Sequence, residues 1–487
     1  MNKRTIISLF CLFSLTLLSA MPRLTVVVVV DGLSSESLHL LRPYWQQGGL
    51  RTLSEEAYQT PLFFPHPVYG GNETTATLMT GLLPREHGYA MDRCFRRIDR
   101  RVCQLLSDEH YHGIGSDQAL SPRAILSPTL SDKVRLREGR DAKIYSIGIE
   151  APTAIVMAGH SANACCWLEP DIPHWAASSF YSEGLPSAAD QMNISGRVTE
   201  LAARTWTPRL DMLTYNRPTD RERKHGFSYT SASVLHRSPA ANELVVELAL
   251  NLQKSQQLGV DMVPDLLLLQ MTALSPAASS DRIATAEQED QYLWLNQHLG
   301  YLMEQLTKRL GKENYQILVV GRPVLGHSAE QLAEAGLTTQ RFNVDQAAAL
   351  ASTYLMAIYG HERWIDGAYG QSIYLNRTLI ERKKMSLTEI QNHLAHFLMD
   401  FEGVQLAFPA LEATHQPALL PSYTKRCFGD ILFTLEPGWQ LMANDHDVTD
   451  HVLDAMPAAP LLWWTGSVRA FPEQPVTALD LDKLLIY

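Results

Sequence analysis

Residues 24–33 read LTVVVVVDGL and decide the fold class of this chain. A continuous valine run without polar alternation is typical of a strand buried on both faces, as in a parallel sheet. The run ends at Asp31, and Gly32 follows it. Because α/β sheets place their ligand chemistry at the carboxyl ends of strands, Asp31 is a candidate functional residue. An aspartate that only caps the following helix is the alternative, and the two roles are compatible.

Two later stretches have the same character, PDLLLLQM at residues 264–271 and YQILVVG at residues 315–321. Between them, residues 284–310 carry leucines at helical spacing, which predicts a long amphipathic helix. Strand, helix and strand in this order indicate a parallel βαβ unit. The sequence therefore predicts an α/β fold with a mainly parallel sheet.

The second half of the chain contains another helix signal, SLTEIQNHLAHFLMDFEGV. Ser386 and Glu389 form a capping box at its start, and Gly403 is expected to end it. Residues of about 170–235 are different, because they are rich in Pro, Ser, Trp and Tyr and lack clean periodicity. We interpret that region as an insertion or cap over the sheet.

The amino terminus has the pattern of a secretory signal. Lys3 and Arg4 precede an apolar run, and Ser19-Ala20 offers a small-residue cleavage site. We therefore expect residues 1–20 to be removed and residues 21–487 to be exported, in bacteria to the periplasm, without a transmembrane segment. An uncleaved membrane anchor is the alternative. The net charge of −11, without a long basic run, argues against nucleic-acid binding.

Cysteine usage fits an oxidising compartment. Cys94 and Cys103 flank the basic stretch FRRIDRRV, which predicts a hairpin closed by a local disulfide. Outside the signal segment the remaining cysteines are Cys165, Cys166 and Cys427. The odd count leaves at least one thiol free or paired between chains.

The stretch YGGNETTATLMTGLLPREHG, residues 69–88, indicates which chemistry the chain could perform. Its middle predicts a short helix with Asn72 available as N-cap. The amino end of such a helix presents free N–H groups and a partial positive charge, which suit an anion. Beside Asp31 at a strand end, this is the layout of a phosphoryl-transfer pocket.

These motifs, in their order and spacing, resemble the alkaline phosphatase superfamily. The resemblance is to PafA-type periplasmic phosphatases and type I phosphodiesterase/nucleotide pyrophosphatases, and it rests on VVVVDGL, TLMTGLLPREHG, SPRAILSPTLSDKV and GDILFTLEPGWQL among others. It implies a three-layer α/β/α sandwich with a mainly parallel central sheet. It also implies a Thr or Ser nucleophile flanked by two zinc ions, which form and hydrolyse a phospho-enzyme.

Carried over position by position, the resemblance places the nucleophile on Gly71 and retains one metal ligand, Asp31. The other positions of its phosphate-binding and metal-binding set fall on Asp92, Glu150, Pro152, Ser275, Ser279, Gly321 and Arg322. A guanidinium in a metal position repels a metal. We therefore predict that Arg322 forms a salt bridge with Asp31, in place of zinc. Thr74 or Thr75 as a displaced nucleophile, and a displaced metal site at His446 and His451, are alternatives.

The resemblance with these substitutions implies a catalytically degenerate pseudo-phosphatase that binds a protein or a small ligand and needs no cofactor. A small anion at Asn72 is conceivable, but the acids Asp92 and Glu150 disfavour phosphate. The alternative is an active zinc-dependent phosphomonoesterase or phosphodiesterase with a rearranged site. A third hypothesis, carbohydrate or peptide binding by the Trp/Tyr-rich insertion, is compatible with the first.

Overall fold

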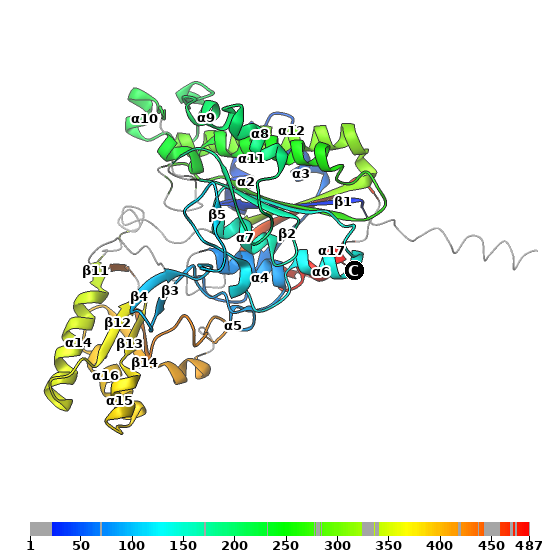
Figure 1. The fold of residues 1–487 in the computed structure, drawn as a ribbon. Coiled ribbons are helices and arrows are strands. Elements are labelled where there is room, and N and C mark those ends of the chain that lie inside the picture. Colours follow the sequence, from blue (N-terminus) through cyan, green and yellow to red (C-terminus); the bar gives the residue numbers. More distant parts are fainter. Residues whose placement is uncertain are drawn as a thin grey trace, which may run out of the picture.

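The computed structural model describes residues 22–68, 71–169, 172–230, 232–276, 278, 283, 285–323, 336, 340–416, 420–436, 438–442, 458–467, 471–472 and 475–486. A ten-stranded mixed sheet lies at its centre, in the order β18-β2-β17-β10-β1-β9-β6-β7-β8-β5 (Figure 1). The parallel strands in the middle are β10 (Tyr315–Arg322), β1 (Leu24–Asp31), β9 (Asp265–Thr272), β6 (Ile144–Gly148) and β7 (Ala164–Leu168). The flanking strands are β17 (Ala458–Thr465), β2 (Tyr58–Phe63), β18 (Val476–Thr477), β8 (Trp175–Ser178) and β5 (Gly113–Ile114).

Helices cover both faces of this sheet (Figure 1). On one face lie α2 (Ser35–Leu41), α3 (Gly49–Glu56), α11 (Pro239–Gln256) and α12 (Ala286–Leu310). On the other lie α4 (Asn72–Thr80), α6 (Leu130–Glu138), α7 (Ala151–Ala158) and α17 (Leu481–Ile486). The valines of β1 alternate between the two layers: Val28 belongs to the core beneath α11 and α12, and Val29 to the core with α4 and α17. The predicted three-layer sandwich is confirmed.

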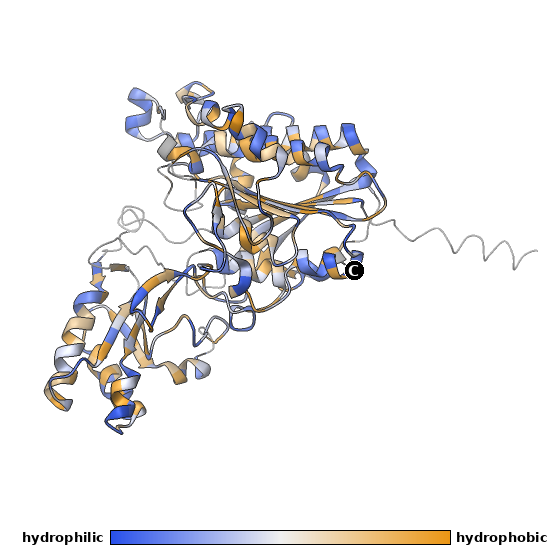
Figure 2. Ribbon diagram, in the orientation of Figure 1, coloured by the Kyte–Doolittle hydropathy of each residue, from blue (hydrophilic) through white to orange (hydrophobic). Residues whose placement is uncertain are grey.

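Hydrophobicity follows this layering. Figure 2 shows mostly hydrophobic central strands, whereas the outer helices mix hydrophilic and hydrophobic residues along their length. All eight residues of β9 and of β10 are buried. This explains why both strands could be predicted from continuous apolar runs. Among the described residues, no helix combines the length and the apolar character that a membrane crossing requires.

The predicted cap region lies on the α11 side of the sheet (Figure 1). Its helices are α8 (Ser187–Ile194), α9 (Arg197–Ala202) and α10 (Asp220–His225). Ion pairs join α9 to α11: Arg197 lies 3.0 Å from Glu247 and 3.4 Å from Glu243. At its other end the region contributes β8 to the main sheet, so it is partly built into the core.

A second sheet, absent from the sequence-based prediction, stands beside the first (Figure 1). Its antiparallel order is β12 (Ile365–Tyr369), β13 (Ser372–Leu375), β15 (Ile431–Leu435) and β14 (Val404–Pro409). The accompanying elements are α14 (Val344–Tyr359), α15 (Arg377–Arg382), α16 (Leu387–Met399) and the strand pair β11 (Gln340–Asn343) with β16 (Trp439–Met442). These elements enclose a hydrophobic core of their own. Of them, only α16 was predicted, and Ser386 caps it as expected.

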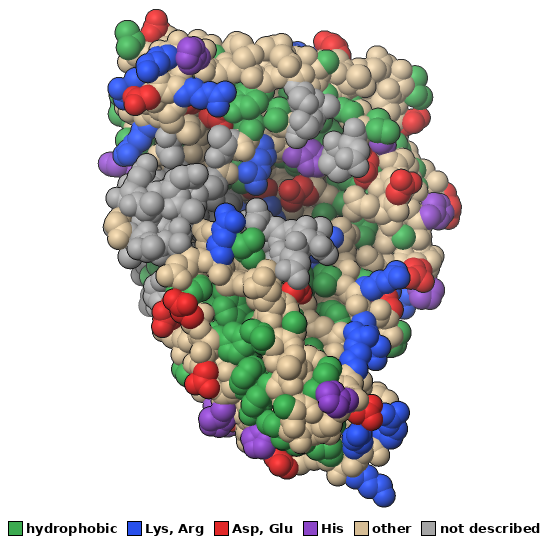
Figure 3. Space-filling view, turned by 90° about the vertical axis from the view of Figure 1, so that its left-hand side faces the viewer, with side chains coloured by type: hydrophobic (Ala, Val, Ile, Leu, Met, Phe, Trp, Pro, Cys, Tyr) green, Lys and Arg blue, Asp and Glu red, His purple; other side chains and the backbone are tan. Residues whose placement is uncertain are grey.

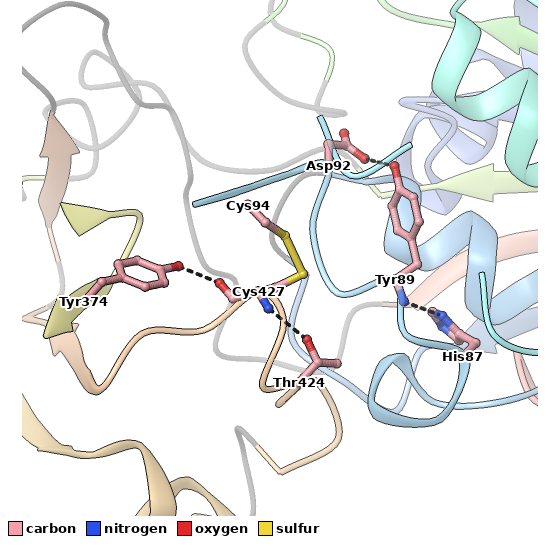
Figure 4. Close-up of a disulfide and its surroundings, with 7 residues drawn as sticks. All are labelled: His87, Tyr89, Asp92, Cys94, Tyr374, Thr424 and Cys427. Atoms are coloured by element: carbon pink, nitrogen blue, oxygen red, sulfur yellow. Dashed lines mark hydrogen bonds between the residues drawn. A yellow bond between two sulfur atoms is a disulfide. The ribbon is translucent and has the colours of Figure 1, made fainter. Parts of the chain in front are cut away.

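A hairpin of β3 (Arg93–Arg96) and β4 (Arg101–Gln104) reaches from the main body to the second sheet. The predicted hairpin is confirmed, but the predicted Cys94–Cys103 disulfide is wrong. Cys94 is bonded to Cys427, 333 residues away (Figure 4). Cys103 is free. The two hairpin cysteines do face each other across the ladder. Local spacing could not reveal a third cysteine that the fold brings in from the far end of the chain.

Candidate functional site

The candidate site lies where β1 and β10 end side by side, next to the amino end of α4. Asp31 and Arg322 are direct neighbours in the parallel register of these strands. The Arg322 Nε atom lies 2.6 Å from Asp31 Oδ1. Both residues are buried, with exposed fractions of 6% for Asp31 and 8% for Arg322. The predicted salt bridge is confirmed.

Gln270, the polar residue of β9, binds the other oxygen of the same carboxylate. Its Nε2 donates to Asp31 Oδ2 at 2.7 Å. Its Oε1 accepts from the backbone N–H groups of Ile149 and Glu150, at 3.0 and 2.9 Å. Sequence reasoning missed Gln270, although a single polar side chain within LLLLQM is the signal that could have found it. Both carboxylate oxygens of Asp31 are thus engaged by protein groups.

The rest of the guanidinium binds to α4 and α7. Arg322 Nη1 donates to Asn72 Oδ1 at 2.8 Å and lies 3.1 Å from Thr153 Oγ1. The Thr153 hydroxyl in turn donates to Asn72 Oδ1 at 2.7 Å. Arg322 Nη2 lies 3.8 Å from the half-exposed Glu150 carboxylate. Thr153 was missed, because the resemblance pointed to its neighbour Pro152, which lies in the first turn of α7.

Asn72 connects this cluster to Asp92. Its Nδ2 donates to Asp92 Oδ2 at 3.0 Å, and the Tyr89 hydroxyl donates to Asp92 Oδ1 at 2.7 Å (Figure 4 shows the second contact). The prediction of Asn72 as the N-cap is wrong, since Gly71 holds that position and Asn72 is the first residue of α4. The Asn72 amide spans Arg322 and Asp92 instead of capping the helix.

Gly71, on which the resemblance places the nucleophile, faces the guanidinium. Its φ of 101° lies in a region that residues with a side chain rarely adopt. A Cβ atom built there would lie 3.7 Å from Arg322 Cζ and 3.7 Å from Nη1. The space in which a nucleophilic side chain would begin is therefore bounded by a fixed cation.

The two threonines considered as displaced nucleophiles lie further along α4. Both are 1% exposed. The Thr74 hydroxyl donates to the Gly71 carbonyl. The Thr75 hydroxyl is buried without a hydrogen-bond partner in the described part of the chain. Their roles stay predictions.

Burial and charge set the protonation of this cluster. Burial raises the pKa of Asp31, and the adjacent Arg322 charge offsets part of that rise. Burial also raises the pKa of Asp92, against the hydrogen bonds from Tyr89 and Asn72. For Arg322, burial alone would lower the pKa, but the charges of Asp31 and Glu150 outweigh it and the pKa is raised. The guanidinium is thus a permanent cation at the ends of the strands.

The donor set around Asp31 does not fit two zinc ions. Zinc in a catalytic site needs about three carboxylate, imidazole or thiolate ligands. Here Asp31 is held by a cation and an amide. Ser275, which the resemblance places in the metal-binding set, is fully buried with a hydroxyl that makes no hydrogen bond to described residues. Over the ranges that the structure describes, no group of three His, Cys, Asp or Glu could hold a metal. Ser279, His446 and His451 lie outside the described residues.

Gly321 has no room for a side chain, although the resemblance places it in the metal-binding set. A Cβ atom there would lie 2.4 Å from the Leu33 carbonyl oxygen and 2.8 Å from Pro460. The glycine lets β10 run close to its neighbours, so that Arg322 reaches Asp31. On the face drawn in Figure 3, basic, acidic and histidine side chains gather in a hollow between the upper and lower parts of the molecule.

Comparison with known families identifies the family of this chain. The sequence model described as type I phosphodiesterase / nucleotide pyrophosphatase matches residues 25–457. This chain belongs to that family. It is 22% identical over 398 residues to the alkaline phosphatase PafA of Elizabethkingia meningoseptica, which covers 77% of this chain and 72% of PafA. A Myroides odoratus protein named calcium-transporting ATPase is 22% identical, with 92% and 88% covered. The Synechococcus elongatus alkaline phosphatase PhoV is 20% identical, with 86% and 81% covered.

Solved structures agree on the fold. The crystal structure of PafA superimposes with a TM-score of 0.83 at 20% identity, covering 95% of this chain and 94% of that one. A phosphonoacetate hydrolase from Sinorhizobium meliloti 1021 superimposes with a TM-score of 0.55 at 13% identity, covering 96% of both chains. The alkaline-phosphatase-like fold and membership of the superfamily follow.

Proposed function

We propose that this chain is an exported, catalytically degenerate member of the alkaline phosphatase superfamily, retained to bind a protein or a small ligand. The single observation that carries the proposal is the Arg322 guanidinium, which lies against Asp31 and faces Gly71. It occupies the region in which the family's mechanism needs a metal and a nucleophile. Phosphoryl transfer needs both groups, because a free hydroxyl is a weak nucleophile without metal or base.

The chemistry of the remaining groups supports the same proposal. Asn72 would be free to bind a ligand oxygen in a working pocket, but here it is held by Arg322, Thr153 and Asp92. Glu150 is an exposed carboxylate beside the guanidinium, and it would repel a phosphate. Among the described residues, the cluster therefore behaves as a hydrogen-bond network that stabilises the ends of the strands, and none of its members is poised for attack.

The signal-like pattern of residues 1–20 and the cysteine usage support export. We infer a binding role because the family fold is intact and the Glu150 carboxylate is exposed beside Arg322. Binding does not require the lost catalytic groups, so the fold can serve it unchanged.

Hydrolysis assays test the proposal directly. The purified full chain is incubated with p-nitrophenyl phosphate and with bis-p-nitrophenyl phosphate, with and without added zinc, beside the matched variant Asp31→Ala. The expected result is the same background rate for both proteins under all conditions. Zinc-dependent turnover by the wild type that Asp31→Ala abolishes would overturn the proposal and establish the active alternative.

A further inference from the structure

Three cysteines meet at the β3–β4 hairpin. Cys94 is bonded to Cys427, which precedes β15 of the second sheet (Figure 4). Cys103 is a free thiol and is the direct partner of Cys94 in the antiparallel register of the hairpin. A free thiol thus stands beside one half of an existing disulfide.

The geometry of the ladder allows the third sulfur to react. Directly paired residues of antiparallel strands have Cα atoms about 4.5–5.5 Å apart and side chains on the same face. A disulfide spans Cα separations of about 4.4–6.8 Å. The register of the hairpin is therefore compatible with a bond between Cys103 and Cys94.

Accessibility also distinguishes Cys103. Cys94 is 7% exposed and Cys427 is fully buried, whereas Cys103 is half-buried. Attack by an external thiol on the Cys94–Cys427 bond is blocked by this burial. The thiolate is the attacking form of a cysteine in thiol–disulfide exchange, and it must be accessible to react.

We propose that Cys103 is the nucleophile of an internal thiol–disulfide exchange. The Cys103 thiolate attacks Cys94 Sγ, the Cys94–Cys427 bond breaks, and Cys427 leaves as a thiolate that takes up the proton released by Cys103. One disulfide and one thiol are present before and after the step, so no oxidant or reductant is consumed. The exchange cuts the covalent link between the hairpin and the second sheet.

Non-covalent contacts keep the hairpin in place after the exchange. Arg97 pairs with the buried Asp430 at 2.9 Å, and Arg100 pairs with Asp366 at 2.8 Å. Because these contacts do not involve sulfur, the exchange breaks the Cys94–Cys427 bond and leaves the ion pairs of the hairpin in place. Cys94 lies two residues beyond Asp92, whose carboxylate accepts a hydrogen bond from Asn72. The exchange therefore removes a covalent link from a segment that also contacts the candidate site.

Thiol mapping of the folded full chain tests the proposal. Wild type and Cys103→Ser are held under native conditions, stopped with acid, denatured and alkylated with N-ethylmaleimide, and the labelled peptides are identified by mass spectrometry. We expect labelled Cys427 in the wild type and loss of that label in Cys103→Ser. The matched control Cys166→Ser, which alters a buried thiol outside the hairpin, should label Cys427 as the wild type does.

A second variant makes the test independent of the population of the exchanged form. Cys427→Ser is treated with oxidised glutathione, and its disulfides are mapped. We expect a bond between its two hairpin cysteines. Free Cys94 and Cys103 thiols after this treatment would overturn the proposal, as would the absence of labelled Cys427 in the native wild type.

Discussion

Arg322 Nε lies 2.6 Å from Asp31 Oδ1, at the point where two adjacent parallel strands end. Each partner supplies the opposite charge that the other requires once it is removed from water. The pair is the feature on which the proposed loss of catalysis rests.

Arg322→Ala should destabilise the protein by about 3–5 kcal/mol, because it leaves the Asp31 carboxylate buried without its counter-charge. Urea unfolding measures the effect. The matched control is Arg382→Ala, whose side chain is 70% exposed and lies 3.8 Å from Glu362. A surface pair of this kind contributes about 0–1 kcal/mol. Equal losses in the two variants would contradict the account.

A double-mutant cycle separates the pair from its surroundings. Asp31→Ala and Arg322→Ala should each lower the free energy of unfolding. The double variant should lower it by less than the sum of the two single effects. We expect a coupling energy of about 1–3 kcal/mol, typical of residues in direct contact. Additive losses would mean that the two side chains do not stabilise each other.

Gly71→Thr, which restores a hydroxyl at the family's nucleophile position, should give no hydrolysis. The substitution should lower the free energy of unfolding by about 1–2 kcal/mol, since a side chain at a φ of 101° is strained. Gly184→Thr is the control, because no atom lies within 4 Å of a Cβ built at that exposed glycine. Unfolding and p-nitrophenyl phosphate assays on both variants check this. Turnover by Gly71→Thr alone would show that a working site survives.

The sequence predicted those parts of the fold that depend on local pattern. The continuous apolar runs of β1, β9 and β10 predicted the parallel core, because such runs fit strands covered on both faces. The Asp31–Arg322 pair was predictable because the resemblance places both residues in the metal-binding set, where the cation of Arg322 could replace the charge of a metal. Gln270 and Thr153 were missed, since a hydrogen-bond partner depends on register and rotamer as well as on residue type.

Features that depend on contacts between distant segments of the chain had no signal in the local sequence. The second sheet is built from short strands of mixed character, and only α16 has clear helical periodicity. The Cys94–Cys427 bond joins segments that the fold brings together from opposite ends of the chain. The spacing of Cys94 and Cys103 predicted the hairpin correctly and the disulfide wrongly, because facing cysteines need not be the bonded ones.

Acid should weaken the protein through two buried histidines behind α4. Thr77 Oγ1 lies 2.9 Å from His66 Nε2 and 3.1 Å from His87 Nε2. Burial lowers the pKa of His66 to about 4, and burial together with the charge of His66 lowers that of His87 to about 3. Both rings are neutral in the fold. Their stabilising contribution is complete above the unfolded pKa of about 6.5 and is lost as the pH falls through the folded values.

One substitution tests whether the buried histidines cause the pH dependence of the free energy of unfolding. Each neutral histidine should make the free energy of unfolding fall by up to about 1.4 kcal/mol per pH unit between pH of about 6.5 and the folded pKa. His66→Gln should flatten this slope relative to the wild type. His361→Gln, which replaces an exposed histidine outside this cluster, is the matched control. An unaltered slope in His66→Gln would contradict the assignment.

Metal content of the native protein tests the central claim most directly. Protein purified without chelators and equilibrated with zinc is passed through a desalting column and measured by elemental analysis, beside Asp31→Ala. If Arg322 takes the place of the metal, both proteins should retain far less than one zinc per chain, and zinc should not raise the melting temperature of either. Two zinc ions per wild-type chain, lost in Asp31→Ala, would contradict it.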